Sequence, residues 1–188
     1  FSTLSQIVVF NTKFLRVSCN YLSIPLSILT TSAPPPSKRA KVYANKLFDS
    51  HGRQIRDLRL SVTDRCNFRC IYCMDPDVKY IPKMQLLSLD EYIRLAKVAK
   101  SLGIKKLRIT GGEPTLYPQL QELLESVGSM GFDDIALTTN GSRVTRSQAT
   151  RWKDARLNRV TVSLDTLQPM RKDAITRSHT TLKDVIAA

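Results

Sequence analysis

The stretch Leu58-Arg59-Leu60-Ser61-Val62-Thr63 alternates strictly between apolar and polar residues. Successive side chains of a β-strand point to opposite faces, so this strand is predicted to have one apolar face and one polar face. Residues 106–110, 135–139 and 159–164 repeat the pattern. A parallel sheet with helices on both faces has strands that are apolar throughout. The alternation therefore predicts an α/β fold of another kind, a partial (βα) barrel with helices outside and a polar cavity inside.

Amphipathic helices are predicted between these strands, as crossover connections of a parallel sheet. The capping-box sequence Ser88-Leu89-Asp90-Glu91 opens the first of them, and Gly103 ends it. Further helices are predicted over 118–131, 145–155 and 172–188. The chain therefore contains about four βα units.

Three of the four cysteines, Cys66, Cys70 and Cys73, lie in the loop after the first strand, with the spacing C-x3-C-x2-C. Each iron of a four-iron cluster needs one terminal ligand, so three thiolates would leave one iron open. A structural zinc site needs four ligands, and neither Cys19 nor a histidine has the spacing of a zinc finger. A disulfide would leave one cysteine of the three unpaired. The spacing favours an iron–sulfur site, with zinc or buried thiols as alternatives.

Polar and glycine-rich stretches follow the other three strands: Gly111-Gly112-Glu113-Pro114, Asn140-Gly141 and Asp165-Thr166. In a (βα) barrel, residues at the carboxyl ends of the strands form the active site. Paired glycines let a ligand approach the backbone closely, although they are also common in plain turns.

Arg59 and Arg108 are predicted on the polar face of neighbouring strands, where an unpaired cation would be costly to desolvate. Two guanidinium groups that converge there suit a phosphate-bearing substrate. The alternative is an internal salt bridge to Glu113 or Asp165.

The pattern C-x3-C-x-aromatic-C resembles the signature of the radical S-adenosylmethionine (SAM) enzymes. Within that group, several stretches between residues 47 and 165 resemble the GTP 3',8-cyclase family. They are residues 52–66, Arg108-Ile109-Thr110-Gly111-Gly112-Glu113-Pro114, Leu137-Thr138-Thr139-Asn140-Gly141 and Val162-Ser163-Leu164-Asp165. The resemblance implies a radical SAM barrel of six units in the family, of which this chain would contain about four.

The resemblance also implies cofactors and site residues. A [4Fe-4S] cluster would be held by Cys66, Cys70 and Cys73, with SAM on the fourth iron. SAM contacts are implied at Tyr72, Gly112 and Ser163. GTP contacts are implied at Arg59, Arg108 and Thr138.

The implied activity is a step of molybdenum cofactor (molybdopterin) biosynthesis. The 5'-deoxyadenosyl radical made from SAM would remove the ribose 3' hydrogen of GTP, giving (8S)-3',8-cyclo-7,8-dihydroguanosine 5'-triphosphate. An electron donor is then also expected, and the chain is expected to pair as a homodimer or with a full-length partner.

The chain departs from the family in its later part. The family holds guanine with a second three-cysteine cluster near its C-terminus, and no cysteine follows Cys73 here. The 188-residue chain is therefore predicted to be a fragment or short isoform that does not complete the cyclisation alone. The alternatives are a non-catalytic module that binds the cluster and SAM, and a radical SAM enzyme with another substrate.

Charge and hydropathy limit the partners. The net charge is +13, but no dense Lys/Arg stripe with aromatic residues predicts binding to nucleic acid. A basic zinc module that binds nucleic acid is thus a remote alternative. No apolar run of membrane-spanning length is present, so no membrane partner is expected.

The N-terminal segment differs in composition from the rest. Residues 1–48 contain six of the 29 basic residues and no acidic residue. Ser- and Thr-rich, basic, acid-free segments are typical of organellar transit peptides, and residues 33–39 have the composition of an extended linker. Residues 1–46 are therefore predicted to be a transit peptide and disordered linker for the mitochondrial matrix, and residues 47–188 the radical SAM core domain.

Overall fold

The structure, a computed structural model, describes residues 6–9, 14–18, 22–25, 41–43 and 45–188. Its centre is a seven-stranded sheet with the order β3-β2-β1-β6-β7-β8-β9. The four strands predicted from the alternating pattern are parallel neighbours in it. They are β6 (Asp57–Ser61), β7 (Lys106–Thr110), β8 (Asp134–Thr139) and β9 (Arg159–Val162). The prediction of a partial (βα) barrel with four parallel strands is confirmed.

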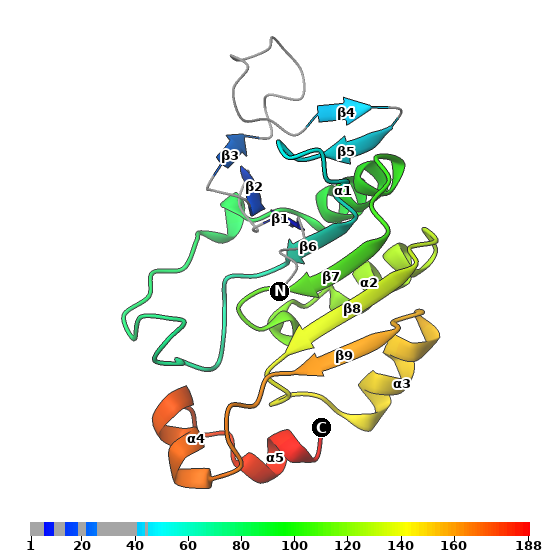
Figure 1. Cartoon of the computed structure of the whole chain (residues 1–188). Helices are drawn as coiled ribbons and strands as arrows, with labels where there is room; N and C mark the ends of the chain where they lie inside the picture. The colour runs from blue at the N-terminus through cyan, green and yellow to red at the C-terminus, as the bar shows by residue number, and fades with distance from the viewer. Residues whose placement is uncertain (1–5, 10–13, 19–21, 26–40, 44) are drawn as a thin grey trace.

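The helices between these strands lie together on one face of the sheet (Figure 1). They are α1 (Leu89–Ser101), α2 (Leu120–Gly128) and α3 (Arg146–Asp154). The capping box predicted for α1 is present, because the Ser88 hydroxyl accepts from the Glu91 amide and the Glu91 carboxylate accepts from the Ser88 amide. Thr145 and Gln148 form a second capping box at the start of α3, which was not predicted from the sequence.

The apolar side chains of β6, β7 and β8 form the core under these helices, as predicted. The six that alternate along the three strands are each at most 3% exposed: Leu58, Leu60, Leu107, Ile109, Ile135 and Leu137. The prediction is wrong for β9 and its extension, where Val160, Val162 and Leu164 are 37% to 41% exposed. The reason is that β9 is the last strand and has a neighbour on one side only.

The prediction of one helix over residues 172–188 is also wrong. The structure has two helices there, α4 (Pro169–Thr176) and α5 (Leu182–Ile186). Arg177 separates them with a φ of 47°, in the left-handed region, which cannot continue a right-handed helix. Thr181 then caps α5 by accepting from the Asp184 amide.

The described part of the N-terminal segment contains strands. β1 (Gln6–Val9) pairs in parallel with β6, and β2 (Phe14–Ser18) and β3 (Leu22–Pro25) extend the sheet beyond it. β4 (Lys41–Tyr43) and β5 (Lys46–Phe48) form a separate hairpin. The predicted linker lies outside the described residues, and the targeting role and the boundary at residue 46 stay predictions.

Two short 3-10 helices lie in the connections that follow β6 and β7. They are η2 (Lys83–Gln85) and η3 (Pro114–Leu116). None of the described helices has the length and apolar character that a membrane span requires.

Candidate functional site

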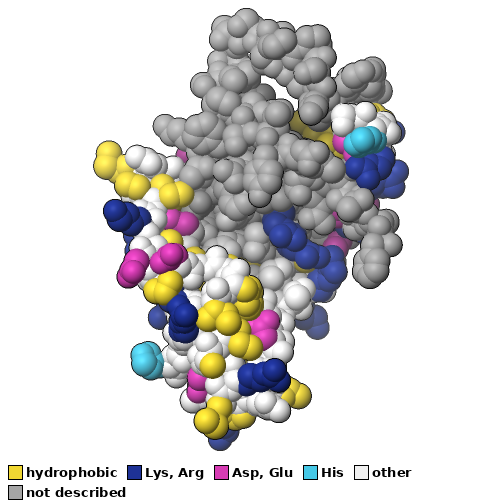
Figure 2. Space-filling view, turned by 60° about the vertical axis from the view of Figure 1, so that its left-hand side comes forward, with side chains coloured by type: hydrophobic (Ala, Val, Ile, Leu, Met, Phe, Trp, Pro, Cys, Tyr) yellow, Lys and Arg dark blue, Asp and Glu magenta, His cyan; other side chains and the backbone are white. Residues whose placement is uncertain are grey.

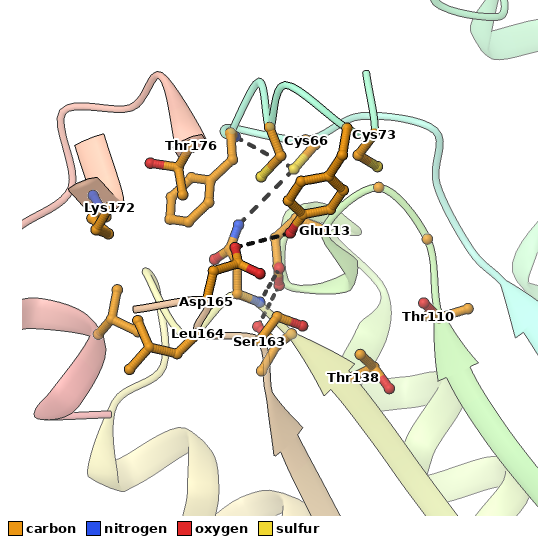
Figure 3. A pocket seen from close by; sticks show the side chains of 18 residues that line it. Cys66, Cys73, Thr110, Glu113, Thr138, Ser163, Leu164, Asp165, Lys172 and Thr176 are labelled. Atoms are coloured by element: carbon orange, nitrogen blue, oxygen red, sulfur yellow. Dashed lines mark hydrogen bonds between the residues drawn. The ribbon is translucent and has the colours of Figure 1, made fainter. Parts of the chain in front are cut away.

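A cavity of about 230 Å³ opens where the four parallel strands end (Figure 3). Seven of the nine site residues predicted from the sequence line it: Cys66, Cys70, Cys73, Tyr72, Gly112, Thr138 and Ser163. The other two, Arg59 and Arg108, line a separate and smaller cleft. The prediction that all the polar residues share one cavity is therefore correct for the strand ends and wrong for the two arginines.

The three cysteines of the loop after β6 are free thiols. The amides of Cys73 and Met74 both donate to the Cys70 carbonyl, so one turn joins the last two cysteines. The Phe68 amide donates to Cys66 Sγ at 3.4 Å. Burial raises the pKa of both the Cys66 and the Cys70 thiol. A metal that binds thiols with a raised pKa must displace their protons.

The spacing of these thiols bears on which metal they suit. Among the described residues, no three Cys, His, Asp or Glu side chains are close enough to hold a single metal ion. Thiolates that share one zinc ion at about 2.3 Å must lie within about 4.6 Å of one another. Three thiolates alone leave a structural zinc ion one ligand short, whereas they can serve three of the four irons of a cluster. Cys19 lies outside the described residues.

The cysteine loop, the segment after β6 that carries Cys66, Cys70 and Cys73, is hydrogen-bonded to α4. This contact was not predicted from the sequence. The amides of Arg69 and Ile71 donate to the carbonyls of Thr176 and Ile175, at 2.8 and 3.0 Å. Phe68 is buried beside this contact, at 4% exposure. The loop thus has a defined backbone even though Tyr72 and Cys73 are exposed.

Further hydrogen bonds fix the Cys66 end of the loop. The Arg69 guanidinium donates to the Cys66 carbonyl at 2.6 Å, and the Tyr80 hydroxyl donates to the same oxygen at 3.3 Å. The guanidinium groups of Arg65 and Arg69 also stack over the Tyr80 ring, at 5.2 and 5.5 Å from its centre.

Gly111 and Gly112 pack against the backbone immediately before Cys66. The Gly112 amide donates to the Thr63 carbonyl at 2.6 Å, and the Glu113 amide donates to the Arg65 carbonyl at 2.7 Å. A Cβ on Gly112 would lie 2.3 Å from the Arg65 oxygen, and one on Gly111 would lie 2.6 Å from the Thr63 oxygen. The glycines are thus needed for packing between two strand ends, in addition to the ligand approach predicted from the sequence.

Gly112→Ala should therefore disturb the cysteine loop as well as stability. Overpacking against rigid backbone typically costs about 1–3 kcal/mol, and here the displaced backbone leads directly into Cys66. The matched control is Gly131→Ala, where a Cβ meets nothing within 4 Å but φ is +71°. We expect both variants to unfold at lower urea concentrations, and only Gly112→Ala to retain less iron after anaerobic reconstitution. Equal iron content in the two variants would contradict this role.

Glu113 is buried, at 1% exposure, and its carboxylate accepts four hydrogen bonds. Thr115 supplies two of them, and the Thr139 hydroxyl and the Asn140 amide supply the others, at 2.6 and 2.7 Å. Glu113 therefore joins the ends of β7 and β8. Its position in a strand-end motif was evident from the sequence, but these partners were not.

Tyr72 and Ser163 both line the cavity and are exposed. The Tyr72 hydroxyl donates to Asp165 Oδ2 at 2.9 Å, which links the cysteine loop to the end of β9. Burial and this hydrogen bond raise the pKa of Tyr72 above its ordinary value. Thr138 lies deeper, and its buried hydroxyl has no hydrogen-bond partner.

Arg59 and Arg108 are register partners on β6 and β7. They share their cleft with Lys106 and Arg159, the latter paired with Asp134. Arg59 Nε is buried without a hydrogen-bond partner. Burial, and then the charge of Arg108, lower the pKa of Arg59. Neither Arg59 nor Arg108 forms a salt bridge within the described part of the chain, so the alternative of a pair with Glu113 or Asp165 is wrong.

The charged surface has no single basic stripe on the face in Figure 2, where Lys and Arg side chains lie in separate groups among acidic and hydrophobic ones.

Residues 60–188 match the Radical SAM superfamily. The match covers more than half of the chain, and it includes β7, β8, β9, the cysteine loop and the cavity. The chain therefore belongs to the radical SAM superfamily. The superfamily implies a [4Fe-4S] cluster and SAM.

Several curated relatives are GTP 3',8-cyclases. The chain is 47% identical over 131 residues to GTP 3',8-cyclase 1 of Pseudomonas aeruginosa, covering 69% of this chain and 40% of that protein. It is 44% identical over 146 residues to the GTP 3',8-cyclase of Saccharophagus degradans, covering 76% and 44%. The chain thus spans about two fifths of the length of these relatives.

Solved structures share the fold at lower identity. SuiB of Streptococcus suis bound to the precursor peptide SuiA matches with a TM-score of 0.55 and 22% identity, over 65% of this chain and 27% of that chain. TYW1 with a lysine-pyruvate adduct matches with a TM-score of 0.50 and 20% identity, over 74% and 51%. These likenesses concern the fold alone.

Proposed function

We propose that this chain is the cluster- and SAM-binding part of a GTP 3',8-cyclase of molybdenum cofactor biosynthesis. The observation that carries the proposal is that the three free thiols share one cavity with Gly112 and Ser163. The identity to curated GTP 3',8-cyclases, 44% to 47% over most of this chain, supports the substrate.

In this proposal Cys66, Cys70 and Cys73 would hold three irons of a [4Fe-4S] cluster, and the open iron would be left for SAM. The group would supply, when bound, the electron for reductive cleavage of SAM, which is the chemistry needed to remove the ribose 3' hydrogen of GTP. The protein orients the reactants and excludes water that would quench the radical.

The SAM contacts are proposed at the mouth and back of the cavity. Tyr72 would contact the adenine, and Ser163 would contact SAM from the end of β9. Gly112 would meet the methionyl amino group through its carbonyl, since its amide already donates to Thr63.

GTP would lie along the polar face of the sheet, below SAM. Arg59 and Arg108 would bind phosphate oxygens, and the unpartnered Thr138 hydroxyl would bind the nucleotide. The smaller cleft supports this assignment because neither Arg59 nor Arg108 has a carboxylate partner within the described residues. An electron donor, a paired chain and the mitochondrial matrix remain predictions.

Anaerobic reconstitution followed by electron paramagnetic resonance (EPR) tests the proposal. The dithionite-reduced chain should give the signal of a [4Fe-4S] cluster, and SAM should change its g-values because a ligand joins the open iron. S-adenosylhomocysteine is the control, because it has the same amino and carboxylate groups but no positive sulfur. A change in the g-values with this compound would come from chelation of the iron and not from the positive charge. A cluster spectrum that neither compound changes would contradict the proposed SAM site.

A further inference from the structure

The side-chain amide of Asn140, directly after β8, lies against the cysteine loop. Asn140 is 8% exposed. Its Nδ2 lies 4.0 Å from Cys66 Sγ and 2.9 Å from Asn67 Oδ1. It is therefore placed to donate one N–H to Asn67 and to direct the other toward the Cys66 sulfur.

The orientation of this amide is fixed by its neighbours. The Ser142 backbone N–H donates to Asn140 Oδ1 at 2.9 Å, and a backbone N–H can only donate. The oxygen of the amide must therefore face Ser142, and the NH2 group must face Cys66. The Ser142 hydroxyl donates to the same oxygen at 2.6 Å and accepts from Asn67 Nδ2 at 2.8 Å, which completes a ring of three side chains.

The backbone of Asn140 is fixed independently of the cysteine loop. Its amide donates to the buried Glu113 carboxylate at 2.7 Å. The neighbouring Thr139 hydroxyl donates to the other oxygen of that carboxylate at 2.6 Å. The backbone that carries this side chain is thus held by the ends of β7 and β8.

We propose that Asn140 is a positioning residue that donates an N–H to the Cys66 thiolate and so raises the reduction potential of the cluster. The inference rests on the proposed function, in which Cys66 binds iron. One-electron reduction adds negative charge to the cluster and its thiolates, and N–H donors to the sulfurs stabilise that charge. The Phe68 amide, 3.4 Å from the same sulfur, would contribute in the same way.

Asn140→Leu tests this by removing the donor while keeping a similar volume. In an EPR-monitored titration with dithionite and without SAM, the midpoint potential should fall. At a fixed potential, we expect the ratio of oxidised to reduced cluster to rise roughly three- to tenfold. This corresponds to a fall in midpoint potential of about 30–60 mV, at 59 mV per tenfold for one electron. The control is Ser142→Ala, which removes a hydroxyl from the ring but keeps the backbone N–H that orients Asn140. Its potential should equal that of the unmodified chain.

Asn140→Asp provides a second test if the leucine variant loses its cluster. Aspartate keeps the shape and accepts from Ser142, but it has no N–H and adds negative charge beside the sulfur, so the potential should fall further. Asn158→Asp adds the same charge at the other end of β8, where the Asn158 side-chain oxygen accepts from the Ile135 amide, and should change the potential little.

The outcomes separate the two proposals. Unchanged potentials in both Asn140 variants, or an equal fall in Ser142→Ala, would overturn the role of Asn140 and leave the cluster assignment intact. An unmodified chain that takes up no cluster would overturn the proposed function and this inference with it.

Discussion

Cys66→Ala should abolish cluster binding. Three thiolates are the smallest set that leaves one iron open, and loss of one exposes a second iron to solvent. Cys66 Sγ also accepts from the Phe68 amide and lies 4.0 Å from Asn140 Nδ2. We expect the reconstituted variant to lose the [4Fe-4S] EPR signal and nearly all of its bound iron.

Cys19→Ala is the matched control, since Cys19 is the one cysteine outside the motif. It should retain iron like the unmodified chain. Far-ultraviolet circular dichroism of apo Cys66→Ala should match that of the unmodified apo chain, because the core residues lie on the other face of the sheet. A Cys66→Ala chain that keeps a cubane and still cleaves SAM would show that the ligand assignment is wrong.

Arg59→Ala should weaken GTP binding by a factor of roughly 10 to 100, which corresponds to one lost charge-assisted hydrogen bond of about 1.5–3 kcal/mol. Arg108→Ala should have a similar effect. Arg59→Lys should recover only part of the loss, because an ammonium group keeps the charge but lacks the planar fork that binds two phosphate oxygens. Isothermal titration of the reconstituted chain with GTP measures each effect.

The control for charge is Arg94→Ala, an exposed arginine on α1. It should bind GTP like the unmodified chain. The melting temperature of the GTP-free chain distinguishes lost binding from unfolding. Arg59 is partly buried beside Arg108, and its Nε is unpaired. Arg59→Ala should therefore not lower this melting temperature. Unchanged GTP affinity in both alanine variants would contradict the assignment of the small cleft.

The sheet and the cavity were predictable because β-strands have a period of two. The alternation at Leu58 to Thr63 gave the buried and polar faces directly, and the motifs at the strand ends had to meet at one edge of the sheet. The alternating pattern does not show how far along its strand each polar residue lies from the cavity. Arg59 and Arg108 share the polar face with Thr138, yet they lie nearer the start of the strands and line a different cleft.

Other features depend on contacts between distant parts of the chain. The interruption at Arg177 is not marked by glycine or proline. The amide of Asn140 reaches Cys66 across 74 positions, and no local spacing indicates such a contact. The exposure of Val160 follows from the place of β9 in the sheet order, which composition does not determine.

The carbonyls of Ile175 and Thr176 that accept from the cysteine loop lie about one hundred residues after it in the chain. During synthesis the thiols therefore leave the ribosome long before the helix that fixes their backbone exists. Metal delivered to a nascent chain would meet an unformed loop. Loading of iron and sulfide should accordingly follow synthesis of α4.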